Sequence, residues 1–426
     1  MTGVLRVRRW LRRLAGALGI LLLLLGGWLL YQEIASRLFL NRVLRELRAD
    51  GVPLTWEEFE RSYDVPEPEA VEKLLRALEG LYEIPPLTEA EQALVPIEGC
   101  AIDPAQLDTP FAPEMLEALR VRVEQMEPQL DALRSVLTFA EPLYSPVTNL
   151  DHRTSHIIAT RQAAHILRMA ALDRALAGDA HEAQAMVTDE FRLAAAMRGN
   201  ELLIDAMMRT ALQSDAVNSL QWVLAKLDLA PGKLGEWDEH LAVPLDISDS
   251  LRGELVFTAM MFEKSRYSCD GSDWRTWLRW PGSGGWMRMN EAYILQLHAE
   301  TIRMWGLPWD EFERRHKMLM GDVPMIYGLV HIYDHNGRMK ERELWARGLT
   351  ECARIGIAIE KYLHDEHRLP DRLGDLVPAY MKELPTGPFY GEPFTYKREG
   401  RRGVIRFDAP EDISSGTFTV VGPPDG

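Results

Sequence analysis

The most constraining feature of this 426-residue chain is an uncharged stretch near its N-terminus, from Leu14 to Tyr31. A helix of that length rises about 27 Å at ~1.5 Å per residue, close to the thickness of a bilayer's hydrocarbon layer. Gln32 and Glu33 follow the stretch, whereas five arginines precede it: Arg6, Arg8, Arg9, Arg12 and Arg13. Excess arginine marks the cytoplasmic side. The pattern therefore predicts a single-pass protein of a bacterial inner membrane, with residues 1–13 cytoplasmic, residues 14–31 spanning, and the bulk periplasmic or otherwise extracytoplasmic.

A cleaved secretory signal is the alternative for the same N-terminus, because it also combines a charged start with an apolar core. Such a signal ends in small residues three positions and one position before the cut. After the apolar stretch, the sequence offers only Ile34 with Ser36, or Glu33 with Ala35. Neither pair consists of two small residues, so the sequence favours an uncleaved anchor and leaves cleavage open.

The charge of the chain argues against one large class of function. The formal net charge is −16 even with the five leading arginines included, so the part beyond the membrane is strongly acidic. An acidic surface repels phosphate backbones. We therefore expect no nucleic-acid partner and expect the charge to favour solubility.

Three cysteines are too few for a disulfide framework, although export would allow one pair to oxidise. Cys100 and Cys269 lie in loop-like surroundings rich in proline and glycine, so they are the favoured pair. Cys352 lies in an apolar helical stretch and is expected in the core.

Most of the chain beyond the membrane shows helical periodicity. From Gln32 to Arg48 we expect the membrane helix to continue as a stalk with one broad apolar face. That face carries Ile34, Leu38, Val43, Leu44 and Leu47. A proline-rich connector completes residues 32–112, and residues 113–335 are expected to form a helical ectodomain. Its first helix, Pro113 to Leu137, contains Pro128 and is expected as two pieces or as one kinked helix.

Two amphipathic stretches, Asp151 to Leu176 and His181 to Met197, predict an antiparallel helical hairpin. At the turn, Ala175, Gly178, Asp179 and Ala183 stand where small and turn residues stand in tetratricopeptide-type repeats, so the hairpin resembles one such unit. Further helices are predicted at Leu202 to Leu227, Leu234 to Leu241, Leu251 to Lys264, Met289 to Trp305 and Trp309 to Leu319.

Residues 336–426 are organised differently. A long helix, about Arg338 to His364, leads into a run that contains Pro370, Leu376, Pro378, Tyr380, Leu384, Pro385, Pro388, Gly391, Pro393 and Tyr396. Strand-like segments are Phe394 to Lys397, Val404 to Phe407 and Thr417 to Val421. We expect a three-stranded antiparallel sheet packed on the long helix, as a small α+β domain at the end of a mainly α protein.

The spacing of these ten residues resembles that in the C-terminal half of the major pseudopilins of type II secretion, over about residues 352–397. In that family a helix leads into such a run and then into a small antiparallel sheet. The whole chain also resembles single-span bacterial membrane proteins with a G-x-PLT-x-EE stretch, here Gly51, Pro53, Leu54, Thr55, Glu57 and Glu58. These resemblances imply envelope or secretion partners and carry no activity with them.

Two histidine pairs have the i, i+4 spacing that places both rings on one side of a helix. They are His152 with His156 and His331 with His335, and Asp334 can supply a further ligand. The second pair reads HIYDH and lacks the glutamate of HExxH metalloproteases. A divalent metal and a metal-dependent hydrolase activity are therefore an alternative hypothesis, beside an ordinary role for histidines at helix surfaces.

A segment between Asp273 and Trp286 is rich in tryptophan and arginine, which are enriched in protein interaction hot spots. The candidate contact residues are Trp274, Trp277, Arg279, Trp280 and Trp286. Exposed tryptophans also stack on sugars or insert at a membrane surface, so the segment fits a glycan-binding protein or a loop that dips into the membrane as well. In a purely structural role, the same rings would close the helical core beneath a long loop.

The sequence contains no nucleophile elbow, phosphate-binding loop, dinucleotide fingerprint or zinc-type cysteine spacing. It therefore favours a membrane-tethered scaffold or interaction protein over an enzyme. The candidate contact regions are the tryptophan-rich segment and residues Pro378 to Tyr396. The metal-dependent hydrolase and the glycan-binding protein remain as alternatives.

Overall fold

The computed structural model describes residues 2–55, 57–58, 61, 68–85, 87–94, 107–138, 150–197, 202–243, 245–267, 283–323, 336–411, 413 and 415–422. The chain forms two compact units, each assembled from separate stretches of sequence. The first comprises Met1–Ser62, Arg252–Gly306 and Glu313–Asn336, and the second comprises Tyr63–Leu251, Leu307–Phe312 and Gly337–Gly426. The ranges expected from the sequence were continuous, whereas the stalk shares its unit with helices from the middle of the chain.

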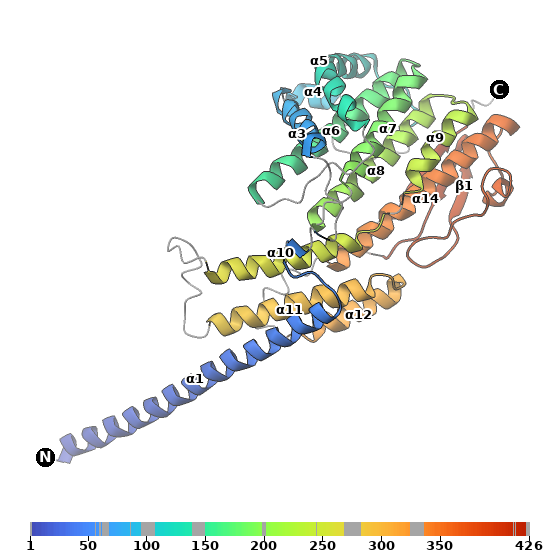
Figure 1. Ribbon diagram of the computed structural model, residues 1–426. Coiled ribbons are helices and arrows are strands. Elements are labelled where there is room, and N and C mark those ends of the chain that lie inside the picture. Colours follow the sequence, from blue (N-terminus) through green and yellow to red (C-terminus); the bar gives the residue numbers. More distant parts are fainter. Residues whose placement is uncertain are drawn as a thin grey trace. The chain divides into compact units, whose positions relative to one another are not determined.

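The first unit contains the N-terminal helix α1, Thr2–Ala49, which runs without interruption through the apolar stretch and the stalk (Figure 1). No proline lies within it, so no backbone hydrogen bond of the ladder has to be lost. Within the described part of the chain, this is the one helix long and apolar enough to cross a membrane, and its most apolar window is not buried by protein. The predicted spanning-length helix and its continuation as a stalk are both confirmed.

The stalk half of α1 packs against α11, Ser283–Met304 (Figure 1). Helix α10, Ser248–Tyr267, contributes Leu255 and Ala259 to the same buried core. These two helices cover only one side of the stalk. The buried core that the three helices share consists of Leu40, Val43, Leu47, Leu54, Leu255, Ala259, Ala292, Leu295 and Ala299.

The predicted apolar face of the stalk is wrong at its first two positions. Ile34 and Leu38 are exposed, whereas Ser36 and Leu40 are buried on the same side as Val43 and Leu47. Helical spacing alone permits either face, because each continues at steps of three and four residues. Polar contacts with α11 decide the choice. Arg288 of α11 pairs with Glu33 and donates to the Ser36 hydroxyl at 3.3 Å.

The second unit begins with a series of helices that includes the predicted hairpin. They are α3, Pro68–Gly80; the 3-10 turn η1, Leu81–Glu83; α4, Glu89–Leu94; α5, Pro113–Leu137; α6, Leu150–Leu176; α7, Ala180–Ala196; α8, Leu203–Lys226; and α9, Pro231–Leu241. Helix α12, Trp309–Gly321, begins in this unit and continues in the other. Pro128 lies inside α5, which is therefore one helix across that position.

Helices α6 and α7 form the predicted hairpin. Gly178 has φ +79°, a conformation that is strained for other L residues and therefore favours glycine at this turn. Asp179 caps α7, because its side chain accepts a hydrogen bond from the Glu182 backbone N–H at 3.1 Å. The turn chemistry in the sequence thus determines where α6 ends and α7 begins.

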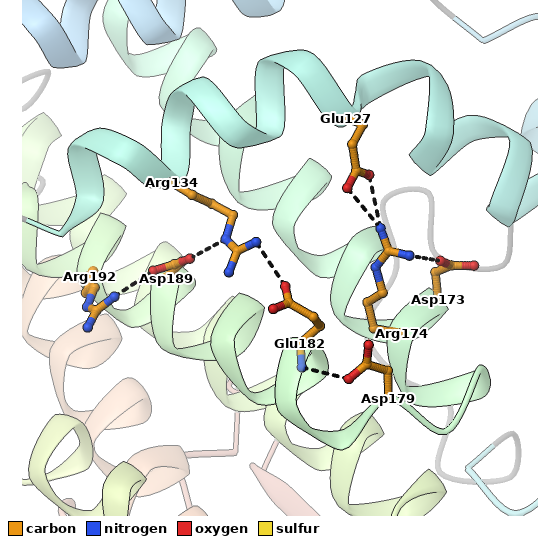
Figure 2. A network of polar contacts seen from close by, with 8 residues as sticks. All are labelled: Glu127, Arg134, Asp173, Arg174, Asp179, Glu182, Asp189 and Arg192. Atoms are coloured by element: carbon orange, nitrogen blue, oxygen red, sulfur yellow. Dashed lines mark hydrogen bonds and ion pairs between the residues drawn. The ribbon is translucent and has the colours of Figure 1, made fainter.

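Ion pairs tie α5 to this hairpin (Figure 2). Arg134 of α5 donates to Asp189 and to Glu182 of α7, each at 3.0 Å. Arg174 of α6 reaches back to both carboxylate oxygens of Glu127 on α5, at 3.0 and 3.1 Å. Burial raises the pKa of Asp189, although Arg134 opposes the shift. A nearly buried carboxylate of this kind requires its arginine partner, so the network restricts the register of α5 on the hairpin.

The C-terminal residues form the predicted helix and sheet. Helix α14, Asn336–Glu366, is followed by the 3-10 turn η4, Leu373–Leu376, and then by strands β1, Thr395–Glu399, β2, Arg402–Arg406, and β3, Thr417–Val421. The strands pair antiparallel in chain order, with Ile405 opposite both Tyr396 and Phe418. A three-stranded antiparallel sheet in a mainly α protein is therefore confirmed.

Helix α14 approaches this sheet closely at two glycines. A Cβ atom at Gly348 would lie 2.6 Å from the ring of Phe407, and one at Gly356 would collide with the ring of Phe418. Both rings are almost completely buried. Cys352, between the two glycines in sequence, is buried as a free thiol, as expected for a core residue. Cys100 and Cys269 lie outside the described residues.

We expect Gly356→Ala and Gly348→Ala to destabilise the protein, even though alanine is the better helix former. Overpacking against a buried ring costs about 1–3 kcal/mol. Gly235→Ala on α9 is the matched control, since nothing lies within 4 Å of its added Cβ. That variant should gain up to about 1 kcal/mol. Urea unfolding of the detergent-solubilised protein measures all three, and stabilisation by Gly356→Ala would contradict the close packing.

Candidate binding groove

A groove made of two neighbouring hollows follows one side of α14 in the second unit. Its first part has a volume of about 810 Å³ and lies between α9, α14 and residues 380–386. Its second part, of about 710 Å³, lies between the start of α12, α14 and residues 385–391. Glu351, Pro385 and Thr386 line both parts, so the two hollows are direct neighbours.

The floor of the groove is a stripe along α14. It consists of Arg347, Glu351, Arg354, Ala358 and Lys361, which succeed one another at steps of four and three residues and therefore share one helix face. Other faces of the helix carry the glycines and the thiol that pack in the core. One amphipathic helix thus supplies both a packing surface and the groove floor.

One wall of the groove is the segment that follows η4. At its start, the Tyr380 backbone N–H donates to Leu376 O at 2.9 Å, and the Tyr380 hydroxyl donates to Asp365 at 3.1 Å. Desolvation, followed by the contact with Asp365, raises the pKa of Tyr380. The tyrosine therefore remains protonated and anchors the wall to the C-terminal end of α14.

The far end of the same wall is fixed by a tight turn and a buried ring. Gly391 has φ +71° and donates its backbone N–H to Gly387 O at 3.0 Å, while Gly387 donates to Glu392 O at 2.7 Å. Between them, Phe389 is buried and meets Trp309 edge to face, with ring centroids 5.7 Å apart. The wall is therefore held at both ends, and its middle is free to present side chains.

The lining mixes charge with exposed apolar surface. Lys361 pairs with Asp238 of α9 at 2.8 Å, and Arg354 pairs with Glu351 at 2.9 Å. Leu384 and Tyr390 on the wall are 37% and 49% exposed. Such a combination of apolar anchors and polar rim is typical of protein contact surfaces. No serine, cysteine or histidine occurs among the lining residues that the structure describes.

The sequence-predicted site residues have different outcomes. Within the predicted region Pro378 to Tyr396, residues 380–391 supply one wall of the groove, whereas the α9 and α14 sides were not predicted. The 3/4 spacing of charged residues on α14 was the available signal for the floor. Trp286 is on α11, partly buried against a core of the first unit that includes Phe262 and Ile294.

The remaining candidates cannot be placed in this geometry. Trp274, Trp277, Arg279, Trp280, His331, Asp334 and His335 lie outside the described residues. His152 and His156 are on α6, but their side chains are also outside the described part. Across the residues that the structure does describe, no cluster of three histidine, cysteine or acidic side chains could hold a metal ion.

A buried carboxyl group lies on α14 outside the groove lining. The Oε1 atom of Glu360 is buried and has no hydrogen-bond partner among the described residues. Burial, and secondarily the charge of Asp228, raises the pKa of Glu360 to about 8. The side chain is therefore neutral in the folded protein at pH 7.

Comparisons with protein-family models, curated proteins and solved structures gave no match to this chain. The groove is therefore interpreted from its own side chains.

We expect the contribution of Glu360 to the free energy of unfolding to fall as the pH rises from about 4.5 to about 8. The folded protein retains a proton on Glu360 that the unfolded chain has released, which gives a slope of at most about 1.4 kcal/mol per pH unit. Glu360→Gln should remove this contribution, so the variant gains stability relative to the native protein as the pH rises. Urea unfolding between about pH 5 and about pH 8 measures the difference.

The control for this experiment is Glu117→Gln, because Glu117 is exposed on α5. It should keep the pH profile of the native protein. A Glu360→Gln variant with that same profile would show that Glu360 titrates normally.

Proposed function

We propose that this protein is a membrane-tethered scaffold whose extracytoplasmic part binds an extended segment of a partner protein in the α14 groove. The observation that carries the proposal is the groove itself, which has a helical floor, a fixed wall and exposed apolar side chains beside ion pairs. The partner belongs to the envelope or secretion machinery. The resemblance of the tail to type II secretion pseudopilins supports that choice.

The dimensions of the groove suit an extended polypeptide. From Arg347 to Lys361 the floor is about 21 Å long at ~1.5 Å per residue. An extended chain covers that length with about six residues at ~3.4 Å each. Leu384 and Tyr390 can contact apolar side chains of the ligand, while the charged floor residues offer polar contacts along its length.

Binding fits the lining better than catalysis does. The cationic residues of the floor are already paired: Arg354 with Glu351, Lys361 with Asp238 of α9, and Arg347 with Glu343 of α14 itself. The described lining offers no nucleophile beside a histidine base. The groove is also long and open, whereas small-molecule sites enclose most of their ligand.

The membrane part of the proposal places the protein in a bacterial inner membrane, with its N-terminus cytoplasmic. The uncharged window of α1 and the arginines before it support this orientation. The second unit, and the part of the first unit beyond residue 31, would then lie on the extracytoplasmic side.

We expect the protein to resist alkaline carbonate extraction, because a spanning helix leaves the bilayer only at the cost of exposing its apolar surface. A phosphatase reporter fused after Gly426 should be active, and a cytoplasmic fluorescent reporter at the same place should not. Replacing Leu22 and Leu24 with arginine should release the protein from the membrane. Activity of the cytoplasmic reporter alone would contradict the orientation.

We expect a photo-crosslinking amino acid at Leu384 to give a discrete adduct in cells. Leu116 on α5 is the matched control, because it is 36% exposed and Leu384 is 37% exposed. The control position should give no adduct of that size. Immunoblotting of the full-length protein after irradiation measures both.

A second variant tests whether the adduct depends on the groove. Ala242 lies on the α9 side of the groove and is exposed, so Ala242→Trp should obstruct the space without entering the core. The adduct at Leu384 should then decrease strongly. Equal adducts with and without this change would show that the contact at Leu384 lies outside the groove.

A further inference from the structure

The stalk of α1 has an exposed face directly opposite the face that packs on α11. At 100° per residue, Tyr31, Ile34 and Leu38 lie about half a turn away from Ser36, Leu40 and Val43. These three apolar side chains are 66%, 50% and 65% exposed. They continue the apolar surface of the spanning window without a break.

On the packed side, α11 covers α1 from the first residue after the uncharged stretch, which ends at Tyr31. A Cβ at Gly285 of α11 would lie 3.2 Å from the Gln32 carbonyl oxygen, so the two backbones touch there. The pairing of Arg288 with Glu33 follows one residue later. The apolar surface therefore ends at Tyr31 on this side, and reaches Leu38 on the other.

This slanted boundary determines how α1 can leave a membrane. The apolar surface is about 27 Å long on the packed side and about 37 Å long on the exposed side, at ~1.5 Å per residue. The longer side fits a hydrocarbon layer of about 30 Å when the helix tilts by about 35°, within the range seen for spanning helices. On such a tilted helix, the face turned toward the bilayer stays in the hydrocarbon layer for more residues than the opposite face does.

Beyond Leu38, the exposed face becomes basic. Asn41, Arg42 and Arg45 continue the same face and are all exposed. Arginine at the edge of an apolar surface attracts the phosphates of lipid headgroups. The change from leucine to arginine therefore coincides with the depth at which a tilted α1 would cross from acyl chains to phosphate.

We propose that the exposed face of the stalk, from Tyr31 to Arg45, docks on the phospholipid interface of the bilayer that α1 spans. Tyr31, Ile34 and Leu38 contact the acyl boundary, and Arg42 and Arg45 contact phosphate groups. Helix α11 then lies on the side of α1 that faces away from the bilayer. This inference rests on the proposed membrane anchor and adds a lipid surface to it.

A second copy of the chain fits this face less well than lipid does. A two-fold contact places the same patch on both partners, so parallel stalks in such a contact would bring Arg42 and Arg45 close to the equivalent arginines of the other copy. Like charges in that arrangement repel. Phosphate groups have the opposite charge, and they are present in every phospholipid.

The test is nitroxide accessibility of the full-length protein in vesicles of phosphatidylethanolamine and phosphatidylglycerol. Labels are attached at Leu38→Cys, Leu23→Cys and Glu46→Cys, with Cys100 and Cys269 replaced by serine and the buried Cys352 retained. Position 23 reports the acyl layer, and position 46 reports water. We expect the label at 38 to collide more often with oxygen than with a water-soluble nickel chelate, as at 23.

The other outcomes overturn the proposal in distinguishable ways. A water-exposed label at 38 with a lipid-exposed label at 23 would reject the docking and keep the anchor. Water-exposed labels at both 38 and 23 would reject the membrane anchor itself. Dipolar broadening between labels at 38, absent at 46, would show that a second copy covers the face.

Charge reversal tests the arginines separately. Arg42→Glu combined with Arg45→Glu should make the label at position 38 collide more often with the nickel chelate and less often with oxygen. The control combines Arg76→Glu with Arg120→Glu, which changes the net charge equally at two exposed positions elsewhere. An equal response in both double variants would reject a specific phosphate contact.

Discussion

The close approach of α14 to the C-terminal sheet is the contact on which the candidate site depends. Gly348 and Gly356 leave room for the rings of Phe407 and Phe418, so the helix lies directly on the strands. Because the faces of α14 that carry these glycines are buried against the sheet, the charged stripe from Arg347 to Lys361 lines the groove. The sheet and the groove are therefore two consequences of one helix orientation.

Charged side chains have a second role in the helical part of the second unit. The pairs that join α5 to the α6–α7 hairpin lie near Asp189, a carboxylate that is almost completely buried. Buried pairs of this kind contribute little net stability, but they penalise any alternative packing that separates the charges. Small residues such as Ala183 and Ala194 allow close helix contact, and the ion pairs select one register.

The stalk shows how polar contacts decide between two apolar faces. Ser36 and Glu33 meet Arg288, and this interaction directs Leu40, Val43 and Leu47 into the core of the first unit. Ile34 and Leu38 are consequently left exposed, next to the most apolar part of α1. If α1 spans a membrane as proposed, lipid is available to cover this exposed apolar surface.

The sequence by itself determined the elements: the spanning-length helix, the α6–α7 hairpin at Gly178 and Asp179, and the three strands after the long helix. These follow from local properties, namely charge-free length, turn chemistry and periodicity. The tertiary structure alone decided which face of the stalk is buried, which discontinuous stretches form a unit, and that α9 and α14 line a groove. Such choices depend on contacts between residues far apart in the chain, and periodicity along one helix does not encode the identity of its neighbour.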